Sequence, residues 1–195
     1  MILGQIYGFS KFGDIDLSKG NLVWTTSDWS DEFKVEYDVI VNKELPAGSW
    51  KSLFRVATEN GQVGGRIPAV FVDPNKHFHI CYRVNGYDNY CQNYSYALNK
   101  DYHFEISQFK NSEDETVYSI KVNGEAFHEI VNTTPLNFKN VNLYLSDPWY
   151  GTFAPFGKLS NLTIIADLTK LSKYLTKCNF CSFMFFSCIH SVSFT

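Results

Sequence analysis

Two predicted loops place aromatic and acidic side chains next to each other. Tyr87 and Asp88 follow an Asn-Gly pair, and Trp149 and Tyr150 come shortly after Asp147. Exposed aromatic rings stack on the faces of sugars or anchor protein partners. Tyr87, Asp88, Trp149 and Tyr150 are therefore candidate ligand-binding residues.

Loop carboxylates are suited to a divalent cation. Ca²⁺ prefers oxygen ligands of this kind, which makes Asp73, Asp88 and Asp147 candidate metal ligands. The sequence indicates no other cofactor. A competing interpretation of Trp149 buries it as a plug at one end of the domain, because large aromatic side chains are mostly buried. The plug is favoured, so Trp149→Ala is expected to affect stability before binding.

Catalysis would need a pair of acids on one strand. Glu36 and Asp38 share a face of the strand predicted over 33–43, but no acid follows Asp38 where the E-x-D-x-x-E pattern of β-sandwich glucanases requires one. Glycosidases place their two carboxyl groups about 5–9.5 Å apart across the scissile bond. A solvated strand face is the favoured interpretation, and a divergent glycoside hydrolase using Glu36 and Asp38 is the alternative. The chain is not predicted to be an enzyme.

The five cysteines fall into two groups, one in the body of the chain and one near its end. Cys81 and Cys91 are symmetric about Gly86, so a hairpin centred there places them directly opposite each other. Cross-strand Cβ atoms lie about 4.5–5.5 Å apart, which a disulfide can bridge after modest adjustment. A Cys81–Cys91 disulfide in an oxidising compartment is favoured over two free thiols.

Three N-x-S/T sequons are candidate glycosylation sites, at Asn93, Asn132 and Asn161. Asn132 is the preferred acceptor, because it lies at a strand end before a turn that contains proline. Asn161 lies inside a predicted strand, which would shelter it. Glycans at any of the three depend on secretion.

The histidines and the remaining cysteines give weak metal signals. His77 and His79 share a face of a predicted strand, yet such pairs are more often ordinary polar residues than ligands. The C-terminal segment contains four further residues of types that bind zinc: Cys178, Cys181, Cys188 and His190. Only the first pair of these has the usual spacing, so zinc is not favoured there.

The elements that position these residues are strands. Residues 33–43 show the clearest alternation, with Phe33, Val35 and Tyr37 on one face. Eleven such segments have the spacing of a sandwich or barrel, and none before residue 166 has a helical period. They are 20–25, 33–43, 50–58, 66–73, 77–83, 90–98, 102–109, 117–122, 125–131, 141–146 and 159–164. The predicted fold is all-β, a two-sheet antiparallel β-sandwich of jelly-roll type.

Composition limits the classes of function. The 195 residues are 17% aromatic and 19% charged, with a net charge of −3. A nucleic-acid-binding protein would show a basic stripe, and none is visible. No linker divides the chain, so we expect one domain over residues 1–166.

The segment 167–195 has a different composition. Its last 18 residues are uncharged and rich in Phe and Cys, close to the ~20 apolar residues of a membrane helix but diluted by polar residues. It is either a truncated membrane or lipid anchor or the product of a faulty gene model. The N-terminal residues do not resemble a secretory signal. The chain is therefore either not exported by that route or a fragment.

Six short segments form a recognisable string along the chain. They are RIPA (66–69), FHIC (78–81), VNG (84–86), YHFEISQ (102–108), YSIKVNGE (118–125) and SDPWY (146–150). Together they resemble a laminin G-like, concanavalin A-like jelly-roll module of uncharacterised, mostly extracellular proteins of invertebrate animals. The resemblance covers about residues 1–166. It implies a jelly-roll sandwich with a binding or adhesive role, assigns no catalytic residue, and provides no residue-by-residue match to the Ca²⁺ site of some laminin G-like domains.

The sequence thus predicts a non-catalytic extracellular module that recognises a glycan or an extracellular protein. Nucleic acid is not an expected partner. Membrane contact is expected only if the C-terminal segment is a real anchor. The alternatives are a divergent glycoside hydrolase and a membrane-tethered structural protein.

Overall fold

The computed structural model describes residues 8–58, 63–147 and 149–169. The strands of this part of the chain are β1 (Gly8–Asp14), β2 (Asn21–Trp29), β3 (Phe33–Val41), β4 (Lys51–Thr58), β5 (Ala69–Val72), β6 (His77–Val84), β7 (Tyr87–Ser95), β8 (Asp101–Lys110), β9 (Thr116–Val122), β10 (Glu125–Val131), β11 (Phe138–Leu145), β12 (Gly151–Thr152) and β13 (Gly157–Ile165).

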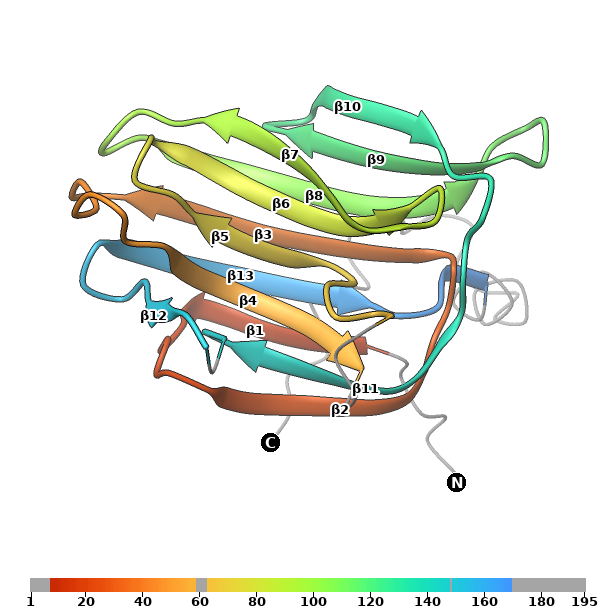
Figure 1. Ribbon diagram of the computed structural model, residues 1–195, viewed down its shortest axis with the longest axis horizontal. Coiled ribbons are helices and arrows are strands. Elements are labelled where there is room, and N and C mark those ends of the chain that lie inside the picture. The colour runs from red at the N-terminus through yellow and green to blue at the C-terminus, as the bar shows by residue number, and fades with distance from the viewer. Residues whose placement is uncertain (1–7, 59–62, 148, 170–195) are drawn as a thin grey trace, which may run out of the picture.

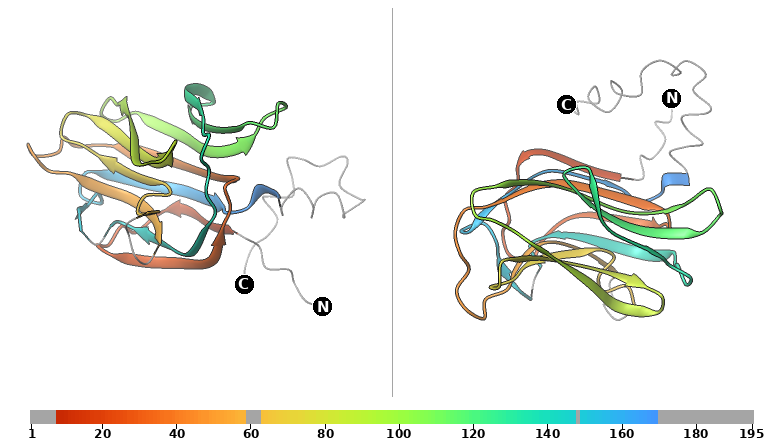
Figure 2. Two further views of the ribbon diagram at one scale, coloured as in Figure 1. Left: turned by 45° about the vertical axis from the view of Figure 1, so that its right-hand side comes forward. Right: turned by 90° about the horizontal axis from the view of Figure 1, so that it is seen from above.

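The strands form two sheets that lie face to face (Figures 1 and 2). The six-stranded sheet has the order β1-β13-β3-β8-β9-β10. The seven-stranded sheet has the order β2-β11-β4-β5-β6-β7, with β12 paired to β4. The β12–β4 pair is parallel, whereas the neighbours along both sheet orders are antiparallel. The predicted two-sheet antiparallel jelly-roll sandwich is confirmed.

The core lies between the inner faces of the two sheets, and β3 shows why. Every second residue of this strand points inward, and the five that do so are at most 2% exposed: Phe33, Val35, Tyr37, Val39 and Val41. Ring contacts join the sheets, with Tyr37 5.2 Å from Phe54 on β4 and Phe33 5.0 Å from Tyr82 on β6. Each buried aromatic side chain contributes about 1.5–3 kcal/mol. The inner faces therefore hold the sheets together, and the outer faces are available for function.

Two Asn-Gly turns join the strands of two hairpins, and each hairpin also has a register shift close to its turn. Asn85-Gly86 joins β6 to β7 with φ angles of 51° and 83°, and Asn123-Gly124 joins β9 to β10 with 54° and 84°. Both central residues of a type I′ turn need a positive φ. The hairpin predicted at Asn123-Gly124 is confirmed. The loop predicted over 85–89 is shorter than expected, because the two-residue turn lets β7 begin at Tyr87.

Strands β1 and β12 were not predicted from the sequence. β1 contains Gly8 and Gly13 and has no regular alternation of apolar residues, so its pattern is weak. It forms because β13 offers a free edge, with Gly8 opposite Ile165. β12 has only two residues, Gly151 and Thr152, which is too short for a periodic signal.

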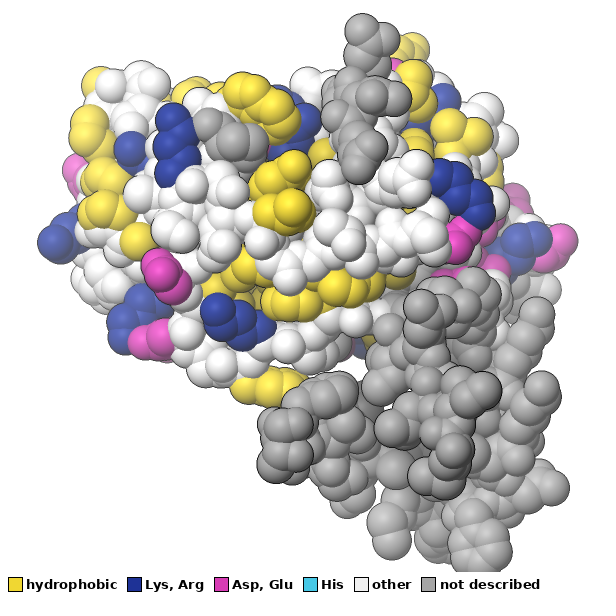
Figure 3. All heavy atoms as spheres, turned by 90° about the horizontal axis from the view of Figure 1, so that it is seen from below, with side chains coloured by type: hydrophobic (Ala, Val, Ile, Leu, Met, Phe, Trp, Pro, Cys, Tyr) yellow, Lys and Arg dark blue, Asp and Glu magenta, His cyan; other side chains and the backbone are white. Residues whose placement is uncertain are grey.

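Strands β1 and β2 lie at one edge of the sandwich. The rings of Phe9 on β1 and Trp24 on β2 are 6.4 Å apart across the gap between the sheets. Figure 3, which views the molecule from this edge, shows hydrophobic side chains in a row between the two layers. Phe12 stays 63% exposed and Leu22 48% exposed. The edge is therefore only partly closed by its own aromatic residues.

Apart from residues 167–169, the predicted C-terminal segment 167–195 lies outside the described residues, and so do its candidate zinc ligands. Across 8–58, 63–147 and 149–169, no helix combines the length and the apolar character needed to cross a membrane.

Candidate binding site

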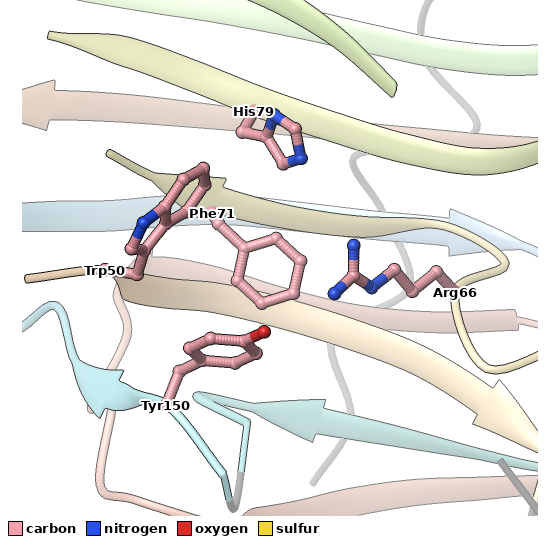
Figure 4. A pocket seen from close by; sticks show the side chains of 5 residues that line it. All are labelled: Trp50, Arg66, Phe71, His79 and Tyr150. Carbon is pink, nitrogen blue, oxygen red and sulfur yellow. The ribbon is translucent and has the colours of Figure 1, made fainter. Parts of the chain in front are cut away.

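A hollow of about 220 Å³ lies on the outer face of the seven-stranded sheet, over β4, β5 and β6 (Figure 4). Five residues from separate parts of the chain line it: Trp50, Arg66, Phe71, His79 and Tyr150. Only Tyr150 belongs to the ligand-binding residues predicted from the sequence. The fold brings the five together because β4, β5 and β6 are neighbours in the sheet.

Phe71 forms the floor of the hollow. β5 is buried along its whole length, with Val70 and Val72 in the core and Phe71 pointing to the other side. His79 is directly opposite Phe71 in the β5–β6 register. Phe71 is only 1% exposed because the other lining side chains surround it. The bottom of the hollow is therefore apolar and is covered by the side chains around it.

Two aromatic side chains flank this floor. The Tyr150 ring lies 5.0 Å from Phe71 at an interplanar angle of 65°, and the Trp50 ring lies 5.0 Å from His79 at 80°. Edge-to-face contacts of this kind are a favoured arrangement of rings. Trp50 and Tyr150 stand on different sides of Phe71, and the Tyr150 hydroxyl lies on the side toward Arg66 (Figure 4). The half-buried rings offer surface on which a ligand can pack.

Arg66 closes another side of the hollow. Its Cζ lies 5.0 Å from the centre of the Phe71 ring. Its Nη1 donates to Asn89 Oδ1 at 2.5 Å and to Cys81 Sγ at 3.5 Å. These contacts attach the guanidinium to the β6–β7 hairpin and aim it across the floor (Figure 4).

The Cys81–Cys91 disulfide links the two strands of the hairpin beside His79. The two cysteines face each other in the β6–β7 register, with an S–S distance of 2.08 Å, as the sequence predicted. His79 Nδ1 bonds Asn93 Oδ1 of the same hairpin at 2.6 Å. His79, Cys81 and Cys91 are also the one group among the described residues that could hold a metal ion. Metal binding by cysteine uses the thiolate, which a disulfide does not offer.

Trp149 lies next to the hollow but does not fill the core. It is 65% exposed and covers the Arg55 guanidinium, whose Cζ is 4.2 Å from the ring centre. The favoured plug interpretation is therefore wrong. Asp147 takes the buried position instead, because it bonds Arg55 Nη1 at 2.9 Å and accepts the Trp149 backbone N–H. An ion pair beneath the indole keeps the ring at the surface.

The three predicted metal ligands each have their own partner. Asp73 accepts the backbone N–H of His77 and bonds its Nδ1 at 2.9 Å. Asp88 pairs with Arg83 at 2.9 Å, and Asp147 pairs with Arg55, as above. Within the described ranges these carboxylates do not form a common group. Their arrangement explains local structure and gives no support to a Ca²⁺ site.

Tyr87 lies at the start of β7 and does not line the hollow. It is 71% exposed and directly follows the Asn-Gly turn. Of the predicted ligand-binding residues, the structure thus brings together Tyr150 and, beside it, Trp149. Tyr87 and Asp88 form a separate surface at the hairpin turn.

The three sequons have very different surroundings. Asn132 is 2% exposed, and its Nδ2 donates to Gln108 Oε1 at 2.8 Å. A glycan there would break this buried bond, so the preference for Asn132 is not supported by its packing. Asn161 is exposed, not sheltered, and its Nδ2 donates to Asp38. Asn93 is exposed, and no bond of its Nδ2 exists within the described part of the chain.

The two carboxylates of the hydrolase alternative lie on the opposite side of the molecule. Glu36 and Asp38 point outward from β3 in the six-stranded sheet. Glu36 pairs with Lys34 at 2.9 Å, and Asp38 pairs with His103 at 2.7 Å. This is the arrangement of a solvated strand face with its charges balanced.

Sequence reasoning missed four of the five lining residues. Trp50 was assigned only to a strand, and Phe71 lies in a run that looked buried on both faces. The spacing of His77 and His79 indicates only a candidate pair of metal ligands. Arg66, Phe71 and His79 lie in or next to the short segments on which the resemblance rests, which was the one available signal. Their convergence depends on the sheet order, which periodicity does not give.

The comparisons with known proteins give similarity in structure alone. No protein-family model and no curated protein matches the sequence. A heptameric SAP-like pentraxin from Limulus polyphemus matches with a TM-score of 0.48 and 14% identity, covering 80% of this chain and 74% of the pentraxin. The CBM40 domain of a Ruminococcus gnavus sialidase, solved with α2,3 sialyllactose, matches with a TM-score of 0.46 and 13% identity, covering 80% of this chain and 93% of that domain.

An enzyme is also among the similar structures. A Trypanosoma rangeli sialidase matches with a TM-score of 0.46 and 15% identity over 69% of this chain, which spans only 20% of the sialidase. At these TM-scores and identities, the similarities support no conclusion about a site or a ligand.

Proposed function

We propose that this protein is a non-catalytic carbohydrate-binding module and that the hollow over β4, β5 and β6 is its binding site. The aromatic hollow is the observation that supports this: Trp50 and Tyr150 flank the Phe71 floor, and polar groups of Arg66 and His79 stand at the rim. Sugars present apolar faces that pack on aromatic rings and hydroxyls that need a few polar partners.

The size of the hollow limits what enters it. Its volume of about 220 Å³ is below the ~300–1,000 Å³ of sites that enclose a whole drug-sized ligand. The ligand therefore inserts a single sugar residue, and the rest of the glycan extends over the outer face of the sheet. Trp149, exposed beside the hollow, is placed to contact that extension.

We place the module outside the cell. The Cys81–Cys91 disulfide supports this, because disulfides persist in oxidising compartments. The proposal also treats residues 1–166 as one sandwich domain, with 167–195 as a separate segment.

A glycan array tests the proposal. The wild-type protein is expected to bind a defined set of glycans, and Trp50→Ala and Tyr150→Ala are each expected to weaken this binding roughly tenfold. Phe12→Ala is the matched control, since Phe12 is an exposed aromatic residue on β1 of the other sheet. Circular dichroism checks that all variants are folded. Wild-type signals at background, or hollow variants that bind like the control, would refute the proposal.

A further inference from the structure

Arg66 differs from the other arginines in its charge environment. The sequence contains three arginines, Arg55, Arg66 and Arg83. Arg55 pairs with Asp147 and Arg83 with Asp88, each at 2.9 Å. Arg66 has no carboxylate partner among the described residues, and none of the five residues that line the hollow is acidic. The hollow therefore contains a half-buried positive charge that the described chain does not balance.

The geometry of the guanidinium leaves one edge available. Asn89 Oδ1 and Cys81 Sγ both accept from Nη1. Nε and Nη2 make no hydrogen bond within the described ranges, and they form the edge that binds a carboxylate or sulfate through two parallel bonds. Because Nη1 is anchored and Phe71 lies under the guanidinium, this edge is already oriented.

Two further polar side chains line the hollow, on opposite sides of Phe71 (Figure 4). His79 Nδ1 is occupied by Asn93 Oδ1, which leaves Nε2 for a ligand. The Tyr150 hydroxyl lies on the side of its ring toward Arg66 (Figure 4). An anion at Arg66 would thus have the Tyr150 hydroxyl on its side of the hollow, next to apolar rings. Hydrogen bonds to charged groups are stronger in partly desolvated sites.

Resting on the proposed carbohydrate-binding function, we propose that the hollow selects acidic saccharides, with the anionic group of the sugar bound to the Nε–Nη2 edge of Arg66. The anionic group is a carboxylate or a sulfate. The sugar ring that bears it packs against the half-buried rings of Trp50 and Tyr150. A neutral sugar fits the same rings but leaves the Arg66 charge without a partner.

Matched pairs of oligosaccharides test this proposal on the full chain by calorimetry or biolayer interferometry. The pairs are sialyllactose with lactose, an oligogalacturonate with its methyl ester, and a heparin tetrasaccharide with its desulfated, carboxyl-reduced form. The acidic member of at least one pair is expected to bind roughly ten to a hundred times more tightly than its neutral partner. The heparin pair tests sulfate and carboxylate together, so a preference that is confined to this pair would indicate recognition of sulfate.

Two variants of Arg66 connect the selectivity to this side chain. Arg66→Gln is expected to bring the affinity for the acidic member of a pair down to that for its neutral partner, and Arg66→Lys, which keeps the charge but loses the planar edge, is expected to be intermediate. Lys121→Gln removes one positive charge from the other sheet and is expected to leave the binding of both acidic and neutral saccharides unchanged. Thermal melts check folding.

The possible failures are distinguishable. Equal binding of acidic and neutral members would overturn the acidic selectivity and leave the carbohydrate-binding function standing. Acidic preference that survives in folded Arg66→Gln would overturn the role of Arg66. Binding of neither member of any pair, together with an empty glycan array, would overturn both proposals.

Discussion

The outer faces of the two sheets differ in how their charges are balanced. On the six-stranded sheet, ion pairs connect β3, β8 and β9: Lys34 and Lys121 both pair with Glu105, and His103 pairs with Asp38. Lys34 also pairs with Glu36 of its own strand. On the seven-stranded sheet, aromatic rings surround Arg66, and no carboxylate of the described chain reaches it.

Glu105 illustrates how completely the first face is satisfied. Burial alone would raise its pKa, but hydrogen bonds from Lys34 and Lys121 outweigh burial and hold the pKa below its usual value. Because this carboxylate already binds two ammonium groups, it has little charge or hydrogen-bonding capacity available for a ligand. Charge that is balanced within a face gives solubility, whereas charge left without a partner beside an apolar floor indicates recognition.

Removal of Arg55 is expected to give the largest effect. Asp147 is fully buried and pairs with Arg55, so Arg55→Ala leaves a buried carboxylate without a cation and is expected to cost about 3–5 kcal/mol of unfolding free energy. Lys34→Ala on the other face is expected to cost less than about 1 kcal/mol. Urea unfolding of both variants measures the contrast. Equal losses of unfolding free energy in the two variants would mean that the ion pairs of the two faces contribute equally to stability.

Loss of the disulfide is expected to rank second. The double variant Cys81→Ala/Cys91→Ala opens a link between residues 10 apart and is expected to lose about 2–4 kcal/mol. It should also weaken saccharide binding, because His79 and Arg66 both contact this hairpin. Urea unfolding and binding to the best array ligand are the measurements. Unchanged saccharide binding in the folded double variant would show that the disulfide-linked hairpin does not hold the binding site in place.

The third expected effect comes from glycosylation, which should affect saccharide binding on one outer face but not on the other. Asn93 borders the hollow through His79, whereas Asn161 lies on the other face beside Asp38. In a host that N-glycosylates, a glycan on Asn93 is expected to cover the hollow. Ser95→Ala should then remove one glycan by mass and improve binding roughly tenfold. Thr163→Ala, which removes the Asn161 sequon, should leave binding unchanged, and improvement by this variant instead would contradict the placement of the site.

Trp149→Ala is expected to have a smaller effect on stability. The indole is 65% exposed, and an exposed cation–π contact is worth about 0.5–1 kcal/mol. The variant should therefore lose no more than about 1 kcal/mol and bind an extended glycan more weakly than a single sugar residue. A loss above about 3 kcal/mol would restore the plug interpretation.

The smallest expected effect is a pH dependence at the junction of the two sheets. His128 on β10 bonds the Tyr90 hydroxyl on β7 at 3.1 Å, and burial lowers the pKa of His128. The unfolded chain, with a histidine pKa near ~6.5, binds the proton more readily, so stability falls as pH drops below that value. Because the ring is partly exposed, the loss should stay under about 0.5 kcal/mol.

His128→Gln is the variant that checks this pH effect. It should remove part of the difference in urea midpoint between pH 7.5 and pH 5.5, which span the value for the unfolded chain. An unchanged difference would assign the pH dependence to other groups.

Alternation was enough to predict the fold class and most strands. Phe33, Val35 and Tyr37 define one face whatever the partner strands are, and the Asn123-Gly124 turn requires a hairpin. Symmetry about Gly86 also predicted the Cys81–Cys91 pair, although the turn is centred between Asn85 and Gly86 and a register shift between Tyr82 and Val84 brings the two cysteines opposite each other. These features are local, so a single sequence contains them.

The site depends on information that is not local. Trp50, Phe71 and Tyr150 become neighbours only through the order of the strands and the parallel β12–β4 contact. The position of Trp149 depends on the Arg55–Asp147 pair, whose members are 92 residues apart. Aromatic type alone could not tell a surface indole from a core one.

The symmetric position of the disulfide has a consequence for strand register. β7 is an edge strand, and a slip of one residue along β6 would turn its side chains over, moving Asn93 inward and Tyr94 outward. The bond between Cys81 and Cys91 at one rung of the ladder forbids that slip. The cross-link therefore acts as a register lock, which preserves the order of groups on the outer face even when the edge of the sheet frays.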